Sequence, residues 1–125
     1  MPYPSLQVTD STGVKRTGPT VTVGAGLGTA PPAIVLNSDY NDDRGSLTFG
    51  SGSAPGAGAI LAFVFAVPKD TSRLPVVSIT ETTVATALLS PAVTSISSTG
   101  FTVSSLIPTA SQANTVYGIQ WTVQD

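Results

Sequence analysis

The feature that most constrains the fold of this chain is its abundance of β-branched and hydroxyl side chains. Its 125 residues include 33 Ser and Thr and 20 Val and Ile, against two Lys and one Glu. β-Branched residues favour strands, whereas the charged and long polar residues that suit solvent-facing helices are scarce. The composition therefore predicts an all-β protein, and the length is that of one domain.

The same composition limits the chemistry that the chain can perform. It has no histidine and no cysteine, which excludes imidazole bases, thiol nucleophiles and the usual zinc ligand sets. Five basic and seven acidic residues give a formal net charge of −2, so no broad basic surface is available for nucleic acid or an anionic membrane. We expect no enzymatic activity, no cofactor, no bound metal, and no nucleic-acid or membrane partner.

Residues 1–44 differ from the rest of the chain. Their alternating stretches are short and are separated by Gly13, Gly18-Pro19, the glycines of 24–28 and Pro31-Pro32. Proline fixes φ and lacks an N–H donor, so it is excluded from central strands. We predict that residues 1–44 form an extended arm whose short strands pair with a partner.

Residues 45–125 show the regular alternation of a β-sandwich. The stretch from Ala59 to Val67 is apolar on both faces, which is typical of a strand inside a sandwich or one covered by another subunit. Residues 93–98 and 101–104 predict a hairpin, with Gly100 supplying a positive φ.

We therefore expect an antiparallel β-sandwich of jelly-roll-like or Greek-key type. The side chains predicted to form its core are Leu47, Phe49, Phe63, Phe65, Val77, Ile79, Ile96, Phe101, Val103, Ile119 and Trp121.

Two motifs suggest ligand sites, but their spacing argues against both. Residues 39–45 carry acidic and amide side chains at alternate positions, as a calcium loop does, yet Arg44 stands where that loop needs glycine and Gly50 where it needs glutamate. Residues 24–28 are glycine-rich like a dinucleotide loop, but Pro31-Pro32 prevents the helix that must follow. We predict a turn or salt-bridged boundary for the first motif. For the second we predict a hinge, or a strand laid against another subunit.

Several short motifs carry a resemblance to a known family. They are Gly45–Phe49, Phe65–Pro68, Pro75–Val77, the Ser-Thr-Gly-Phe-Thr-Val run of 98–103, and the aromatic final strand Tyr117–Val123. In this order they resemble the small β-sandwich domain of tailed-bacteriophage virion proteins, which include head decoration proteins, head fibres and tail fibre modules. The resemblance covers roughly residues 41–125.

The resemblance implies a structural virion protein: a bacteriophage head decoration, or cement, protein on the exterior of the capsid. It implies a homotrimer, and the weakly charged surface independently favours a homo-oligomer. The expected partner is the major capsid protein, bound through the arm by Tyr3, Leu6, Val8, Lys15, Arg16, Val21, Val23, Ile34 and Leu36. The alternative is a tail or head fibre module that binds a host receptor or glycan.

Overall fold

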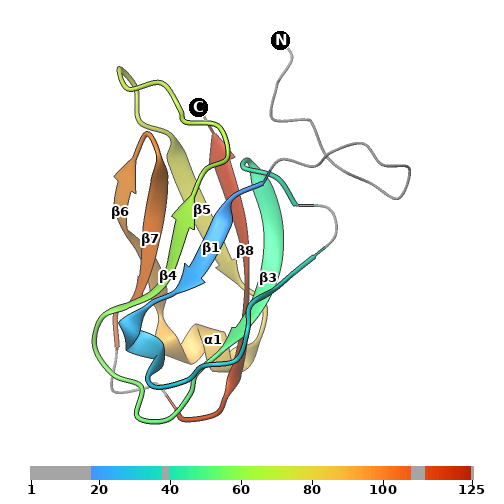
Figure 1. Cartoon of the computed structure of the whole chain (residues 1–125), viewed down its shortest axis with the longest axis vertical. Coiled ribbons are helices and arrows are strands. Elements are labelled where there is room, and N and C mark those ends of the chain that lie inside the picture. Colours follow the sequence, from blue (N-terminus) through green and yellow to red (C-terminus); the bar gives the residue numbers. More distant parts are fainter. Residues whose placement is uncertain (1–17, 38–39, 108–111, 125) are drawn as a thin grey trace.

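Two four-stranded antiparallel sheets pack face to face in the computed structural model, which describes residues 18–37, 40–107 and 112–124 (Figure 1). The first sheet has the order β1 (Thr20–Val23), β4 (Ala59–Val64), β7 (Gly100–Ser105), β6 (Pro91–Ser97). The second has the order β2 (Val35–Leu36), β3 (Arg44–Gly50), β8 (Val116–Gln124), β5 (Val76–Glu81). The predicted all-β sandwich is confirmed.

Aromatic side chains join the two sheets. Phe63 of β4 and Phe101 of β7 stack with ring centroids 4.2 Å apart, and Trp121 of β8 meets Phe63 edge-on at 5.1 Å across the sandwich. Eight of the predicted core residues are buried, and the other three are partly buried and pack against them: Val77, Ile79 and Ile96. These three lie on β5 and β6, each of which is an end strand of its sheet. A side chain on an end strand has a neighbouring strand on one side only.

Strand β4 buries two consecutive residues, Ile60 and Leu61. Strict alternation would place them on opposite faces, but the register with β7 shifts between Ala59 and Leu61. Such an irregularity reorients a side chain. Farther along β4, Val64 is 55% exposed, so the second apolar face of this strand is open at that end in the single chain.

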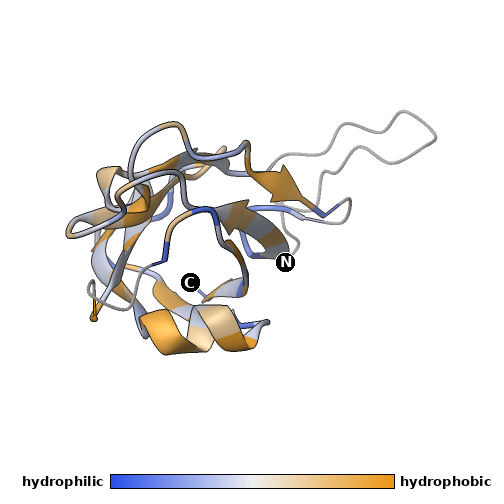
Figure 2. Ribbon diagram, turned by 90° about the horizontal axis from the view of Figure 1, so that it is seen from below, coloured by the Kyte–Doolittle hydropathy of each residue, from blue (hydrophilic) through white to orange (hydrophobic). Residues whose placement is uncertain are grey.

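A short helix, α1 (Val84–Leu89), closes one end of the sandwich between β5 and β6 (Figure 2). Thr83 caps it by accepting a hydrogen bond from the N–H of Thr86, and Ser90 ends it in the left-handed conformation with φ of 48°. The hydroxyl of Thr86 accepts the N–H of Gly118 at 2.8 Å. This bond gives a partner to an N–H group of β8 next to Ile119, where the pairing of β8 with β5 ends.

The predicted hairpin is confirmed, but the reason for its glycine is different. Strands β6 and β7 pair from Ser97 opposite Gly100, leaving Ser98 and Thr99 as the turn. Positive φ values among the described glycines occur at Gly28 and Gly58, so the prediction for Gly100 was wrong. A Cβ at Gly100 would lie 1.9 Å from the carbonyl oxygen of Phe63. Glycine is needed there for the close approach of β4.

The described part of the predicted arm, residues 18–37 and 40–44, belongs to the sandwich, and Arg44 is the first residue of β3. Strand β1 pairs with β4 and strand β2 pairs with β3, so these strands find their partners within the chain. Val21, Ile34 and Leu36 pack against the core. The prolines of this region agree with the rule that proline is excluded from central strands, because β1 and β2 are the end strands of their sheets. A residue that lacks an N–H donor at such an edge leaves no ladder hydrogen bond unmade.

Candidate functional site

A groove runs between the edge strands β1 and β2 on one side of the sandwich. Its volume is about 360 Å³, and its walls are mainly apolar: Val21, Thr22, Val23, Pro31, Pro32, Ala33, Ile34 and Leu36. We call it the edge groove. Val23 is 39% exposed, while Ile34 and Leu36 are half-buried. The groove therefore offers apolar surface that the described residues cover incompletely.

Main-chain groups also face the edge groove. The N–H of Gly24 donates to Ile60 and that of Asn37 donates to Ser46, so these two residues point toward β4 and β3. Because successive strand residues direct their polar groups to opposite sides, Val21, Val23 and Leu36 direct theirs away from the sheets. Both edges can accept an added strand beside an apolar surface.

The glycine-rich stretch of residues 24–28 follows β1 directly. It forms the 3-10 turn η2 (Ala25–Leu27), which buries Leu27. A Cβ at Gly24 would lie 2.1 Å from the carbonyl oxygen of Ala59, and one at Gly28 would lie 2.2 Å from that of Ser53. The stretch was predicted to be a hinge or a strand laid against another subunit. In the structure it packs tightly against β4 and the β3–β4 connection of its own chain.

Four of the nine predicted partner-binding residues line the edge groove: Val21, Val23, Ile34 and Leu36. The sequence placed them in an extended arm, whereas the structure brings them together from two strands. The other five, Tyr3, Leu6, Val8, Lys15 and Arg16, lie outside the described residues. The prolines Pro31 and Pro32 were recognised as strand breakers but not as walls of a groove.

The acidic cluster that precedes β3 forms a turn with an ion pair, as predicted. The side chain of Asn41 accepts the N–H groups of Asp43 and Arg44, and Lys69 Nζ lies 2.8 Å from Asp43 Oδ1. Asp42 is 1% exposed, and its two carboxylate oxygens accept the N–H groups of Ala66 and Val67 at 2.8 and 2.9 Å. Asp42 therefore holds in place the segment that follows β4.

Asp70 forms a second, smaller turn in the β4–β5 connection. It is exposed, and its carboxylate accepts the N–H and the hydroxyl of Ser72 at 2.9 and 2.8 Å. The N–H of Ser72, and then its hydroxyl, hold the pKa of Asp70 below its usual value. This net shift is opposite in direction to the raised pKa of a carboxyl that acts as a general acid.

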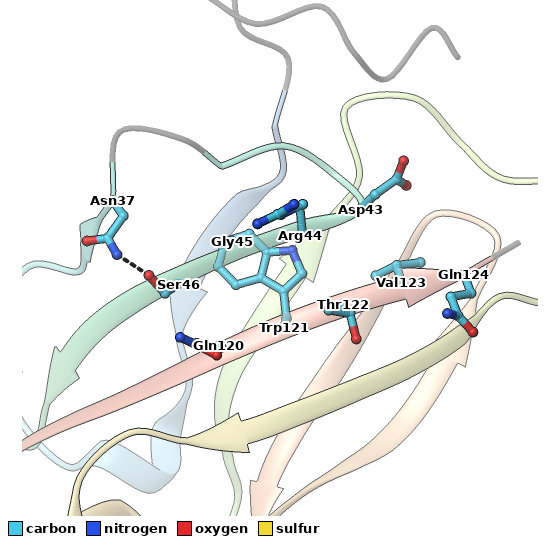
Figure 3. Close-up of a pocket in the computed structure, with 10 residues that line it drawn as sticks. All are labelled: Asn37, Asp43, Arg44, Gly45, Ser46, Gln120, Trp121, Thr122, Val123 and Gln124. Atoms are coloured by element: carbon cyan, nitrogen blue, oxygen red, sulfur yellow. Dashed lines mark hydrogen bonds between the residues drawn. The ribbon is translucent and has the colours of Figure 1, made fainter. Parts of the chain in front are cut away.

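A polar hollow of about 480 Å³ lies over β3 and β8 (Figure 3). Its polar lining combines amides and hydroxyls with a few charged groups: Asn37, Asp43, Arg44, Ser46, Gln120, Thr122 and Gln124. The non-polar residues Gly45, Trp121 and Val123 complete the lining. The amide of Asn37 donates to the hydroxyl of Ser46. These side chains alternate with buried ones along two strands, a pattern that predicts only solvent exposure. No sequence pattern therefore predicted a hollow at this place.

In residues 18–37, 40–107 and 112–124, no group of three acidic side chains is arranged to hold a metal ion. Within the same ranges no helix is long and apolar enough to cross a membrane. No family model, curated protein or solved structure matches the chain.

Proposed function

We propose that this protein is a structural virion protein that decorates the exterior of a bacteriophage head. Its partner is the major capsid protein, and its role is to stabilise the capsid lattice. The observation that carries the proposal is the edge groove, where four residues predicted to bind the partner gather beside two strand edges that pair with no other described strand. The family resemblance of residues 41–125 supplies the virion context.

Attachment occurs by strand addition. An extended segment of the capsid protein hydrogen-bonds to the free edge of β1 or β2 and places alternate side chains against Val23 and Leu36. Main-chain bonds supply affinity in this mode of recognition, and side-chain pockets supply specificity. Residues 1–17, with Tyr3, Leu6, Val8, Lys15 and Arg16, extend the contact beyond the groove. Many modest contacts, multiplied over a homo-oligomer, give a firm attachment.

A pair of matched variants tests the groove. Val23→Lys places a charge in the edge groove, and Val64→Lys places the same charge on the outer face of β4, where Val64 is more exposed. Binding to purified heads that lack the protein is measured by co-sedimentation, with circular dichroism as the check on folding. We expect Val23→Lys to weaken binding at least tenfold and Val64→Lys to leave it unchanged. Equal binding by wild type and Val23→Lys would overturn the proposal.

The polar hollow favours a second candidate, a tail or head fibre module that binds a host glycan. Amides and hydroxyls both donate and accept hydrogen bonds, which matches the hydroxyl groups of a neutral saccharide. The test is adhesion of the purified protein to host cells and its competition with phage adsorption. Adhesion that Gln120→Ala and Gln124→Ala abolish would favour this candidate, and adhesion absent from wild type would end it.

A further inference from the structure

The four end strands of the two sheets are protected to different extents. Natural proteins guard sheet edges with short strands, prolines, bulges or charges, because an open edge pairs with other chains. Strand β2 has two residues and β1 has four after Pro19. Strand β6 starts at Pro91 and has an irregular register between Val93 and Ser95. Strand β5 also follows a proline, Pro75, and ends in a charged residue, Glu81, but it has six residues and an unbroken register, so neither shortness nor a bulge guards its edge.

The free edge of β5 presents a regular row of main-chain groups. The N–H of Thr82 donates to the carbonyl of Gly118 on β8 at 3.0 Å, so the even-numbered residues of β5 point toward β8. By alternation, Val77, Ile79 and Glu81 direct their N–H and C=O groups outward. No hydrogen bond within the described part of the chain reaches these outward groups.

We propose that β5 pairs with β5 of a second copy of this chain, antiparallel about a two-fold axis at Ile79. Ile79 then faces Ile79 of the second copy, and Val77 faces its Glu81. All three outward-directed residues of each copy find partners in this register, and the two four-stranded sheets become one continuous sheet.

The charge that β5 carries does not oppose pairing with a second copy. Glu81 is the one charged residue of β5, and the two-fold axis places the two Glu81 residues at opposite ends of the new pair. The distance between them along the strand is four residue steps, or roughly 14 Å. This distance is longer than the Debye length of about 10 Å at 0.1 M salt. The pairing uses the β5 edge of both copies, so it closes at a dimer, whereas the family resemblance implies a trimer.

A charge swap tests both the pairing and its register. Ser78 and Thr80 are exposed, and they face the neutral Thr122 and Gln120 on β8. In the proposed dimer Ser78 of one copy faces Thr80 of the other. The variant Ser78→Lys/Thr80→Lys therefore opposes like charges, which destabilise a strand pair. The variant Ser78→Glu/Thr80→Lys carries as many new charges but opposes unlike ones.

The mass of the purified full-length chain is measured by light scattering in about 0.1 M salt, with circular dichroism confirming that each variant folds. We expect wild type and Ser78→Glu/Thr80→Lys at twice the chain mass of 12.6 kDa, and Ser78→Lys/Thr80→Lys at the mass of a single chain. A wild-type monomer or trimer, or a dimer that the two lysines leave intact, would overturn the inference. Because no capsid is present, the result is independent of the proposed function.

Discussion

At the scale of single residues, Asp42 connects two segments that lie far apart in the sequence. Its buried carboxylate, just before β3, accepts the N–H groups of Ala66 and Val67, 24 and 25 positions away. The sequence indicated a turn at residues 39–45, because Asn, Asp and Gly favour turns locally. It could not indicate which carboxylate is buried, because the donors come from a distant segment.

Asp42→Ala should lower the free energy of unfolding by about 3 kcal/mol, because two buried N–H groups lose a charged acceptor. Urea denaturation followed by circular dichroism measures the loss. Asp70→Ala is the matched control, since it removes an exposed carboxylate that also accepts two hydrogen bonds. The control should change stability much less. A loss below about 1 kcal/mol for Asp42→Ala would show that the carboxylate does not hold the segment.

The effect of Asp70 should depend on pH in a defined direction. Its pKa is lowered in the folded protein, so its contribution is present above the unfolded pKa and disappears as the pH falls through the folded pKa. The difference between wild type and Asp70→Ala should therefore be seen at neutral pH and vanish in acid. A difference that grows in acid would contradict the assignment of Ser72 as the cause.

At the scale of elements, strands and core were largely predictable from sequence, and the pairing of the short strands was not. The alternation around Phe63 and Trp121 is a local signal with period two, and both residues are buried as predicted. Strands β1 and β2 are too short for alternation to identify the strand each pairs with, so the edge groove could not be derived. The helix α1 has only six residues, too few for a helical period to stand out in the sequence.

Thr86→Val should cost about 2 kcal/mol of stability, although the two side chains have nearly the same shape. The fully buried hydroxyl of Thr86 accepts the N–H of Gly118, and valine leaves that donor without a partner. Thermal and urea unfolding measure the change. Thr48→Val, at an exposed position of β3, should stay within about 0.5 kcal/mol of wild type. Equal effects of the two variants would contradict the role of α1 as a cap on β8.

At the scale of the whole molecule, the two sides of the sandwich differ. The edge groove lies between β1 and β2, and the open edge of β5 lies at the other end of the second sheet. Strand addition at the groove and pairing at β5 can therefore occur together. If the proposed function is correct, a protein with both contacts would link the capsid to a second copy of this chain.

Two deletions test where the folded unit begins. Removing residues 1–36 takes away β1 and β2 with Val21, Ile34 and Leu36, which pack against the core, so this variant should lose cooperative unfolding or become much less stable. Removing residues 1–17 retains every strand pair of the structure and should leave a cooperative transition. Equal stability of the two variants would show that the sandwich begins near residue 45 after all.

The most direct test of the central claim is the position of the protein in the intact particle. Electron cryomicroscopy of the virion should show the sandwich on the capsid exterior, with a strand of the major capsid protein running along the edge groove beside Val23. Density for the sandwich on the tail alone would contradict the account. So would a sandwich on the capsid whose edge groove faces solvent.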